Sequence, residues 1–252
     1  MKLDPPFYAL DEHLAIDLLG ARALFTTRRG GFSQGPYASL NLGRLTDDDP
    51  VAVDRNRAAL QARVGGRLAM IRQVHGSRVL RLEGPPNGAV TGPGAYRELE
   101  EADGHATGRP GIAPMVLTAD CLPIAVAGGG AVAMLHAGWR GLAGGVVAAG
   151  VAAVRALAGD QPLSAAIGPG AGGCCYEVGH EVHRHFTSYG EGAHRGQKLD
   201  LSVIARAQLE RAGVETIHDV SLCTICAPVE LFFSHRRDRG VTGRQAGVAW
   251  LT

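Results

Sequence analysis

Short apolar runs bounded by glycine or proline dominate the first two thirds of the chain, and this pattern constrains its fold most. Runs of about four to eight such residues are typical of buried β-strands. Glycine makes up 36 of the 252 residues, about twice its average share, which favours tight turns and close backbone approaches over disorder. The expected strands are Ala23–Thr27, Leu68–Val74, Val79–Leu82, Pro114–Thr118, Ile124–Ala127, Ala131–Leu135, Ala165–Gly168 and Ala246–Leu251.

Three segments are expected to be helical. Val51–Val64 follows Pro50, a residue that suits a first helical turn. Leu142–Leu157 is rich in alanine and almost entirely apolar, so it should be buried on more than one side. Leu201–Ala212 carries its apolar residues on one face, and the glycine that follows it favours a helix end.

A single α/β domain over residues 1–252 is the architecture that these elements predict, with layered mixed β-sheets flanked by helices. Gly84–Glu101 combines glycine and proline with charged residues, which predicts a long surface loop. Nothing else in the chain resembles a linker between domains.

The composition is that of an ordinary globular protein, with 46% hydrophobic and 19% charged residues. A formal net charge of +1 gives no reason to expect a nucleic-acid partner. We expect no membrane association, because the longest apolar segment is too short to span a bilayer and no export signal is visible. Five cysteines argue against a disulfide framework and favour the cytoplasm. The oligomeric state stays open.

Three expected strands each lead into a side chain that can bind a metal: His75, Cys121 and His136. Folds often place reactive groups at such positions, because the scaffold is rigid and the loop is open. Two imidazoles and one thiolate are a good set for Zn²⁺, and a fourth position left to water would make the site catalytic. Taken singly, each residue is more often a core side chain than a ligand.

Two aspartates lie close to these residues in the sequence. Asp120 precedes Cys121, and Asp103 follows Ala102 in a short polar stretch. Either carboxylate could orient a ligating histidine by accepting its second ring N–H. A loop or capping role is the competing interpretation for each.

The remaining cysteines have no assigned role. Cys174 and Cys175 follow a glycine-rich run that could be an anion cradle or a simple tight turn. Cys223 and Cys226 form a CxxC with no second CxxC nearby, so neither a zinc ribbon nor a redox site is favoured.

A series of short motifs resembles, in order, the YfiH-like or laccase-domain family, long labelled polyphenol oxidase and later purine nucleoside phosphorylase. The resemblance runs from about residue 20 to the C-terminus and implies a fold shared with the catalytic domain of cytotoxic necrotizing factor. The main motifs are SLNLG (Ser39–Gly43), QVHG (Gln73–Gly76), TADCLP (Thr118–Pro123), HAGWRG (His136–Gly141), CCYEVG (Cys174–Gly179), FFSHRRD (Phe232–Asp238) and TGR (Thr242–Arg244).

The resemblance implies that His75, Cys121 and His136 bind zinc and form the catalytic centre. It also implies phosphorolysis of adenosine, inosine and methylthioadenosine, with adenosine deamination alongside. A purine nucleoside and phosphate are then the small-molecule substrates. We expect phosphate contacts from Arg57, Arg140 and Arg236, and nucleoside contacts from Ser39 and Asn41. The histidine of FFSHRRD replaces a tyrosine of many relatives, which could shift substrate preference.

Three alternatives stay open. A metal-free cysteine hydrolase would use Cys121 as its nucleophile, in a role such as editing peptidoglycan precursors. A copper-dependent polyphenol oxidase is disfavoured because the chain has one His-x-His pair, although Cu²⁺ outranks Zn²⁺ at most nitrogen and sulfur sites. A binding protein with a structural zinc would need a fourth ligand, such as Cys174 or Cys175.

Overall fold

The computed structural model describes residues 3–84 and 99–252, so most of the expected loop Gly84–Glu101 lies outside the described residues. The strands form two six-stranded mixed sheets. The first sheet has the order β1 (Tyr8–Leu10), β2 (His13–Leu18), β3 (Ala21–Phe25), β14 (Gln245–Leu251), β7 (Gly111–Thr118) and β4 (Gly66–Ala69).

The second sheet carries most of the remaining strands. Its order is β13 (Thr216–Asp219), β10 (Ser164–Ile167), β8 (Leu122–Gly128), β9 (Ala131–Ala137), β6 (Gly104–Thr107) and β5 (Val79–Arg81). The pairs β4–β7, β5–β6 and β10–β13 are parallel and the other pairs are antiparallel. A small hairpin joins β11 (His194–Arg195) to β12 (Lys198–Leu199).

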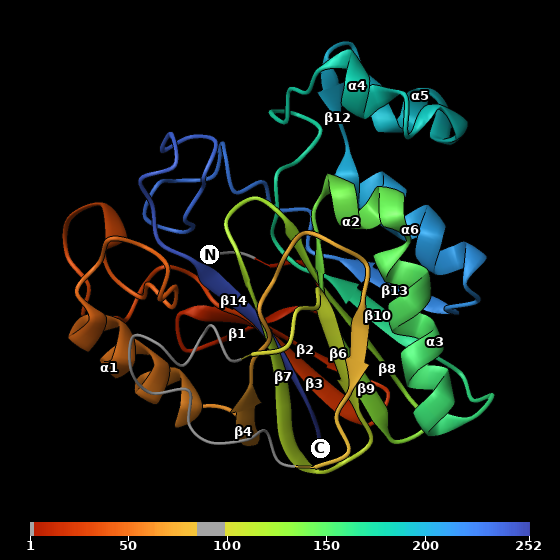
Figure 1. Cartoon of the computed structure of the whole chain (residues 1–252), viewed down its shortest axis with the longest axis horizontal. Coiled ribbons are helices and arrows are strands. Elements are labelled where there is room, and N and C mark those ends of the chain that lie inside the picture. Colours follow the sequence, from red (N-terminus) through yellow and green to blue (C-terminus); the bar gives the residue numbers. More distant parts are fainter. Residues whose placement is uncertain (1–2, 85–98) are drawn as a thin grey trace.

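Helices cover the outer faces of both sheets, as Figure 1 shows. Two of them begin at capping aspartates: Asp49 accepts a hydrogen bond from the N–H of Val51, and Asp200 accepts from two N–H groups of the first turn. The helices are α1 (Pro50–Gln61), α2 (Trp139–Gly144), α3 (Val146–Ala158), α4 (His180–His183), α5 (Gly190–Ala193) and α6 (Leu201–Arg211), with 3₁₀ turns at Gly35–Tyr37 and Thr187–Tyr189.

The core lies in three apolar layers. Side chains between the two sheets form the middle layer, which includes Phe25, Val116 and Met134. A second layer packs α1 through Leu60 against the first sheet. A third packs α3 and α6 against the second sheet through residues such as Leu135. The sheets are therefore buried on both faces, which accounts for the nearly continuous apolar strands.

The predicted α/β architecture with mixed sheets and flanking helices is confirmed, whereas several boundaries were wrong. The expected helix Leu142–Leu157 is two helices, because Gly145 adopts a φ of 86° and ends α2 in the left-handed conformation. The expected strand Leu68–Val74 ends at Ala69. Strands β1, β2, β6, β11, β12 and β13 were not predicted. Among the described residues, no helix is long and apolar enough to cross a membrane.

His105 connects the two sheets. It lies in β6, is fully buried, and its Nε2 is 3.0 Å from the carbonyl oxygen of Met115 in β7. Nδ1 is buried with no hydrogen-bond partner in the described part of the chain, so Nε2 carries the proton and donates. Burial lowers the pKa of His105 to about 4, and burial also lowers that of His13 to about 4.

We predict that acid destabilises the fold through these histidines. The folded pKa lies below the unfolded value of 6.5, so the unfolded chain binds more protons between these two pH values. The contribution of each buried histidine to the free energy of unfolding is fully present above pH ~6.5. It falls as the pH drops toward ~4, by up to about 1.4 kcal/mol per pH unit for each histidine. The variant His105→Gln should show a smaller change in the free energy of unfolding with pH, as measured by urea unfolding at pH 7, 6 and 5. An unchanged slope would contradict the assignment to His105.

Candidate metal centre and pocket

A buried carboxylate shapes the loop that carries His75. His75 lies in a bend with a φ of 60°, a left-handed conformation uncommon outside glycine. The backbone N–H groups of Val74, His75 and Gly76 donate to the Asp103 carboxylate at 3.2, 2.9 and 2.6 Å. Asp103 is fully buried, so these hydrogen bonds replace the water that its charge would otherwise need. The loop is thereby fixed, and the His75 side chain stays exposed.

The same carboxylate orients His136. This histidine lies within β9, not at the strand end where it was expected. Its Nδ1 is 2.8 Å from Asp103 Oδ1, and its backbone N–H donates to the Asp103 carbonyl at 2.7 Å. Burial alone raises the pKa of Asp103, but hydrogen bonds from His136 and Gly76 outweigh it and lower the pKa. Because the ionised carboxylate only accepts, Nδ1 donates to it, and Nε2 is the ring nitrogen that remains for a metal, which would displace any proton there.

Cys121 is held by its neighbour in the sequence. Asp120 connects β7 to β8 with a φ of 92°. Its carboxylate accepts hydrogen bonds from Thr224 Oγ1 and from the backbone N–H of Arg236, both at 2.7 Å. Its carbonyl accepts from the N–H of Ala171 at 2.7 Å. Asp120 therefore supports the position of the thiol. No hydrogen bond among the described residues joins it to His75 or His136.

These elements bring the three expected ligands together. The ligand atoms of His75, Cys121 and His136 lie within 4.8 Å of one another, and the two rings are nearly perpendicular with centroids 4.8 Å apart. A Cβ on Gly138 would lie 2.8 Å from Cys121 Sγ, so only glycine leaves the thiol room there. Two imidazoles and a thiolate, one imidazole already oriented by Asp103, are a donor set that fits Zn²⁺ with one position open.

The ligands also perturb one another's ionisation. Burial raises the pKa of the Cys121 thiol. Electrostatic interactions and hydrogen bonds with His136 and His75 outweigh burial and lower this pKa to about 6. Burial lowers the pKa of His136, yet Cys121 and Asp103 raise it to about 9. At neutral pH the centre therefore holds a thiolate, which is the form that binds metals and attacks electrophiles.

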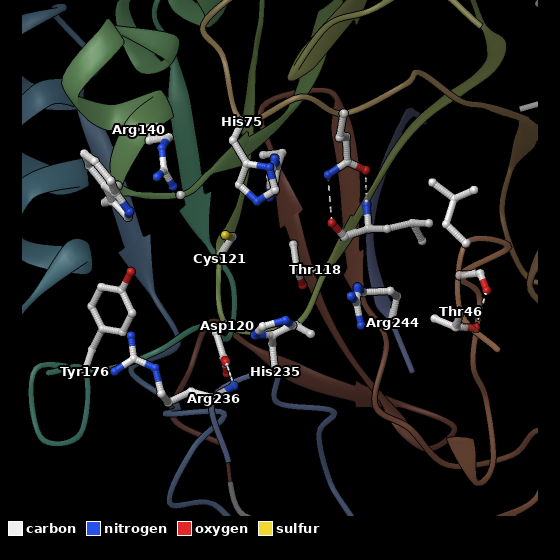
Figure 2. Close-up of a pocket in the computed structure, with 18 of the residues that line it drawn as sticks. Thr46, His75, Thr118, Asp120, Cys121, Arg140, Tyr176, His235, Arg236 and Arg244 are labelled. Atoms are coloured by element: carbon white, nitrogen blue, oxygen red, sulfur yellow. Dashed lines mark hydrogen bonds between the residues drawn. The ribbon is translucent and has the colours of Figure 1, made fainter. Parts of the chain in front are cut away.

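A cavity of about 440 Å³ opens directly over this centre, a volume within the usual range for small-molecule sites. Arg140 and Arg236 line it on one side of Cys121 and Arg244 on the other, and together they make its wall strongly cationic (Figure 2). Arg140 lies 4.3 Å over the Trp139 ring, and Arg236 lies 5.1 Å over the ring of Tyr176. The planes of two guanidinium groups are thus fixed by aromatic rings before any ligand arrives.

Hydrogen bonds hold two of these guanidinium groups without using all of their donors. Arg236 Nη1 donates to the carbonyl of Glu177 at 2.6 Å. Arg244 Nη1 donates to the carbonyls of Thr242 and Gly243 at 3.0 and 2.9 Å. Burial lowers the pKa of Arg244, but a guanidinium stays charged at any physiological pH. The wall can therefore receive an anion in a preset geometry.

Neutral polar groups complete the lining. Tyr176 and Thr118 face the cavity in Figure 2. Burial raises the pKa of Tyr176 to about 12, so its phenol is a hydrogen-bond donor at neutral pH. Thr118 Oγ1 is buried with no partner in the part of the chain that is described, which leaves it free for a ligand. His235 also lines the cavity.

The structure places two of the five residues expected to bind substrate in the cavity lining and three elsewhere. Arg140 and Arg236 line the cavity, as expected of phosphate contacts. The guanidinium of Arg57 is instead buried and donates twice to the carbonyl of Leu42, through Nε and Nη2.

Ser39 and Asn41 also lie outside the cavity lining among the described residues. Ser39 Oγ donates to the carbonyl of Arg28 at 2.9 Å, and Asn41 is fully buried, where its Oδ1 accepts from the N–H groups of Gly43 and Arg244. These contacts hold the loop that leads to the cavity, and they leave both side chains outside the lining that a nucleoside would contact.

Arg244 and Tyr176 were not predicted to contact a ligand. Both belong to motifs that support the family resemblance, TGR and CCYEVG, but the motifs give no direction for either side chain. The alternative of a closed structural zinc at the triad required Cys174 or Cys175 as a fourth ligand. Among the described residues these two group with other cysteines and not with the triad, so the triad keeps an open side.

Comparison with known proteins gives consistent results. The sequence model described as multi-copper polyphenol oxidoreductase laccase matches residues 22–252. A purine nucleoside phosphorylase of Xylella fastidiosa is 40% identical over 92% of this chain and 93% of its own length. Purine nucleoside phosphorylase YfiH of Escherichia coli is 38% identical over 92% of this chain and 94% of its own.

Solved structures agree with these relatives. The hypothetical protein YfiH of Bacillus licheniformis superimposes with a TM-score of 0.88 at 31% identity, over 99% of this chain and all of that one. YlmD of Geobacillus stearothermophilus gives 0.82 at 36% identity, over 92% of each chain. The chain therefore belongs to the laccase-domain family that includes the YfiH proteins.

Proposed function

We propose that this protein is a purine nucleoside phosphorylase whose reaction centre is formed by His75, Cys121 and His136. One observation carries the proposal: a cationic wall and a set of three metal ligands line the same cavity. Phosphorolysis needs an anion-binding surface beside the nucleoside, and the cavity offers it. Relatives over the whole length of the chain are named purine nucleoside phosphorylases, which supports the same activity here.

Zn²⁺ is the metal that we propose for the centre, because the donor set and its oriented histidine suit it. Zinc, when bound, supplies Lewis-acid chemistry to a reacting group next to the three ligands. The chain's own residues supply the rest. Asp103 fixes the orientation of His136, and all three residues that would hold the ion line the cavity.

We assign phosphate binding to Arg140, Arg236 and Arg244. Their guanidinium groups hold the charge of the incoming phosphate and place it for attack on C1′ of the ribose. A bond forms between a phosphate oxygen and C1′, the bond from C1′ to the purine nitrogen breaks, and the purine leaves with the electron pair and takes up a proton. Tyr176 and Thr118 are placed to hydrogen-bond the nucleoside, in the role first expected of Ser39 and Asn41.

The principal test follows purine release. Zinc-loaded protein incubated with adenosine, inosine or methylthioadenosine should release free base only when phosphate is present. Cys121→Ala should abolish this release, because it removes a ligand and the thiolate at the centre. Chromatography of the products measures the outcome. Inosine formed from adenosine without phosphate would add the adenosine deamination that the family resemblance implies, whereas absence of turnover for every purine nucleoside would refute the phosphorylase.

The cationic wall gives a second prediction. Arg244→Ala should raise the KM for phosphate by roughly 10- to 100-fold, since a hydrogen bond between charged groups contributes about 1.5–3 kcal/mol. The KM for the nucleoside should change less. Arg81→Ala, which removes an exposed arginine in β5, is the control of equal charge. A KM for phosphate equal in both variants would show that Arg244 does not bind it.

Asp103 gives a third prediction. Asp103→Asn removes the carboxylate that accepts from His136 and from three backbone N–H groups. We expect zinc affinity to fall by about 10- to 100-fold, as measured by competition with a chromophoric chelator. The matched control is Asp160→Asn, whose carboxylate is fully exposed. Equal affinities in the two variants would contradict the role of Asp103.

A cysteine hydrolase is the second candidate, and the lowered pKa of Cys121 beside His136 favours it. In this reaction the Cys121 thiolate attacks a carbonyl and His136 protonates the leaving group, and water then cleaves the resulting thioester, which frees the thiolate and returns a proton to His136. Metal-free protein should then turn over its substrate and lose activity on alkylation at Cys121. Restoration of activity by zinc, and inhibition by chelators, would support the phosphorylase instead.

A further inference from the structure

Four of the five cysteines of the chain meet at a second point, separate from the triad. The Sγ atoms of Cys174, Cys175, Cys223 and Cys226 all lie within 4.8 Å of one another. Those of Cys174 and Cys226 are 3.6 Å apart, and all four thiols are free. Since Cys121 belongs to the triad, every cysteine of the chain lies in a cluster that could hold a metal.

The spacing of the sulfur atoms fits a metal better than a disulfide. Four thiolates held tetrahedrally at about 2.3 Å from Zn²⁺ lie about 3.8 Å from one another. Sulfur atoms joined in a disulfide are about 2.0 Å apart. The separation between Cys174 and Cys226, at 3.6 Å, is close to the first value.

Backbone N–H groups favour the thiolate form of one of the four cysteines, Cys223. The N–H of Gly172 donates to Cys223 Sγ at 3.3 Å, and the N–H groups of Ile225 and Cys226 also bond to this sulfur. Such hydrogen bonds stabilise the charged form of a thiol. A Cβ on Gly172 would lie 3.2 Å from Cys223 Cβ and 3.3 Å from Cys174 Sγ. Glycine at this position thus lets the two cysteine-bearing loops approach.

We propose that Cys174, Cys175, Cys223 and Cys226 bind one Zn²⁺ ion in a closed, structural site. Four protein ligands fill the tetrahedral coordination of zinc and leave no position for a substrate. The sequence did not reveal this set, because its two halves lie about fifty residues apart and only one half is a CxxC.

The proposed ion would fasten the loop that carries Tyr176 to a second loop, which supports Asp120 in the lining of the substrate cavity. Tyr176, which faces the cavity in Figure 2, directly follows Cys175. Thr224, which follows Cys223, donates to the Asp120 carboxylate beside Cys121. Its backbone N–H donates to the carbonyl of Gly170 at 2.9 Å and so already joins the two loops. A metal on the four thiolates would add a stronger link at the same place.

Zinc content tests this proposal. Protein purified with zinc and analysed by mass spectrometry of the metal should hold two ions per chain. Cys121→Ala should hold one, because it disrupts only the triad, and the double variant Cys223→Ser/Cys226→Ser should also hold one. A single ion in the wild type that is lost entirely in Cys121→Ala would overturn the proposal. This result does not depend on the folding of the double variant, and it leaves the nucleoside assays unaffected.

Thermal unfolding gives a second readout in the Cys121→Ala background, in which the triad holds no metal. A strong zinc chelator should lower the midpoint by at least about 5 °C, since removal of a structural ion removes folding free energy. The chelator should have no effect once Cys223→Ser and Cys226→Ser are added. An unchanged midpoint in Cys121→Ala, or a disulfide between Cys174 and Cys226 in zinc-free protein as purified, would contradict a structural zinc.

Discussion

The buried carboxylate of Asp103 is the constraint on which the centre depends. It accepts hydrogen bonds from three successive backbone N–H groups around His75 and from Nδ1 of His136. One side chain therefore sets both the loop that carries one ligand and the ring orientation of the other. Because the charge is fully buried, loss of any of these partners would leave it poorly solvated. The same carboxylate thus fixes the conformation of the loop and the positions of two side chains that would bind a metal.

The layers of the fold could be predicted from apolar runs and glycine spacing, since strands buried on both faces read as short continuous apolar segments. Less regular elements escaped this reasoning. Strand β6 contains the polar residues His105 and Thr107, which hydrogen-bond to backbone carbonyls inside the core and interrupt the apolar pattern expected of a buried strand. The break at Gly145 depends on a positive φ that a glycine permits but does not require.

The three residues of the triad were singled out because each follows an expected strand and can bind a metal, and because their motifs resemble one family. Contacts with substrate were predicted less well. Asn41 and Arg57 are polar motif residues, yet both are used inside the protein to hold a loop. Whether such a side chain faces inward or toward a ligand depends on tertiary packing, which motif position does not encode. The four-cysteine cluster was missed for the same reason, as only the fold brings its halves together.

The central claim is that His75, Cys121 and His136 hold a metal at the base of a cationic cavity. Diffraction at the zinc absorption edge, from crystals grown with zinc, tests it most directly. The account predicts an anomalous peak about 2.0–2.3 Å from a nitrogen of each histidine and from Cys121 Sγ, with one coordination position facing the cavity. A triad without a peak in a crystal that contains zinc elsewhere, or a peak closed by a fourth protein ligand, would contradict it.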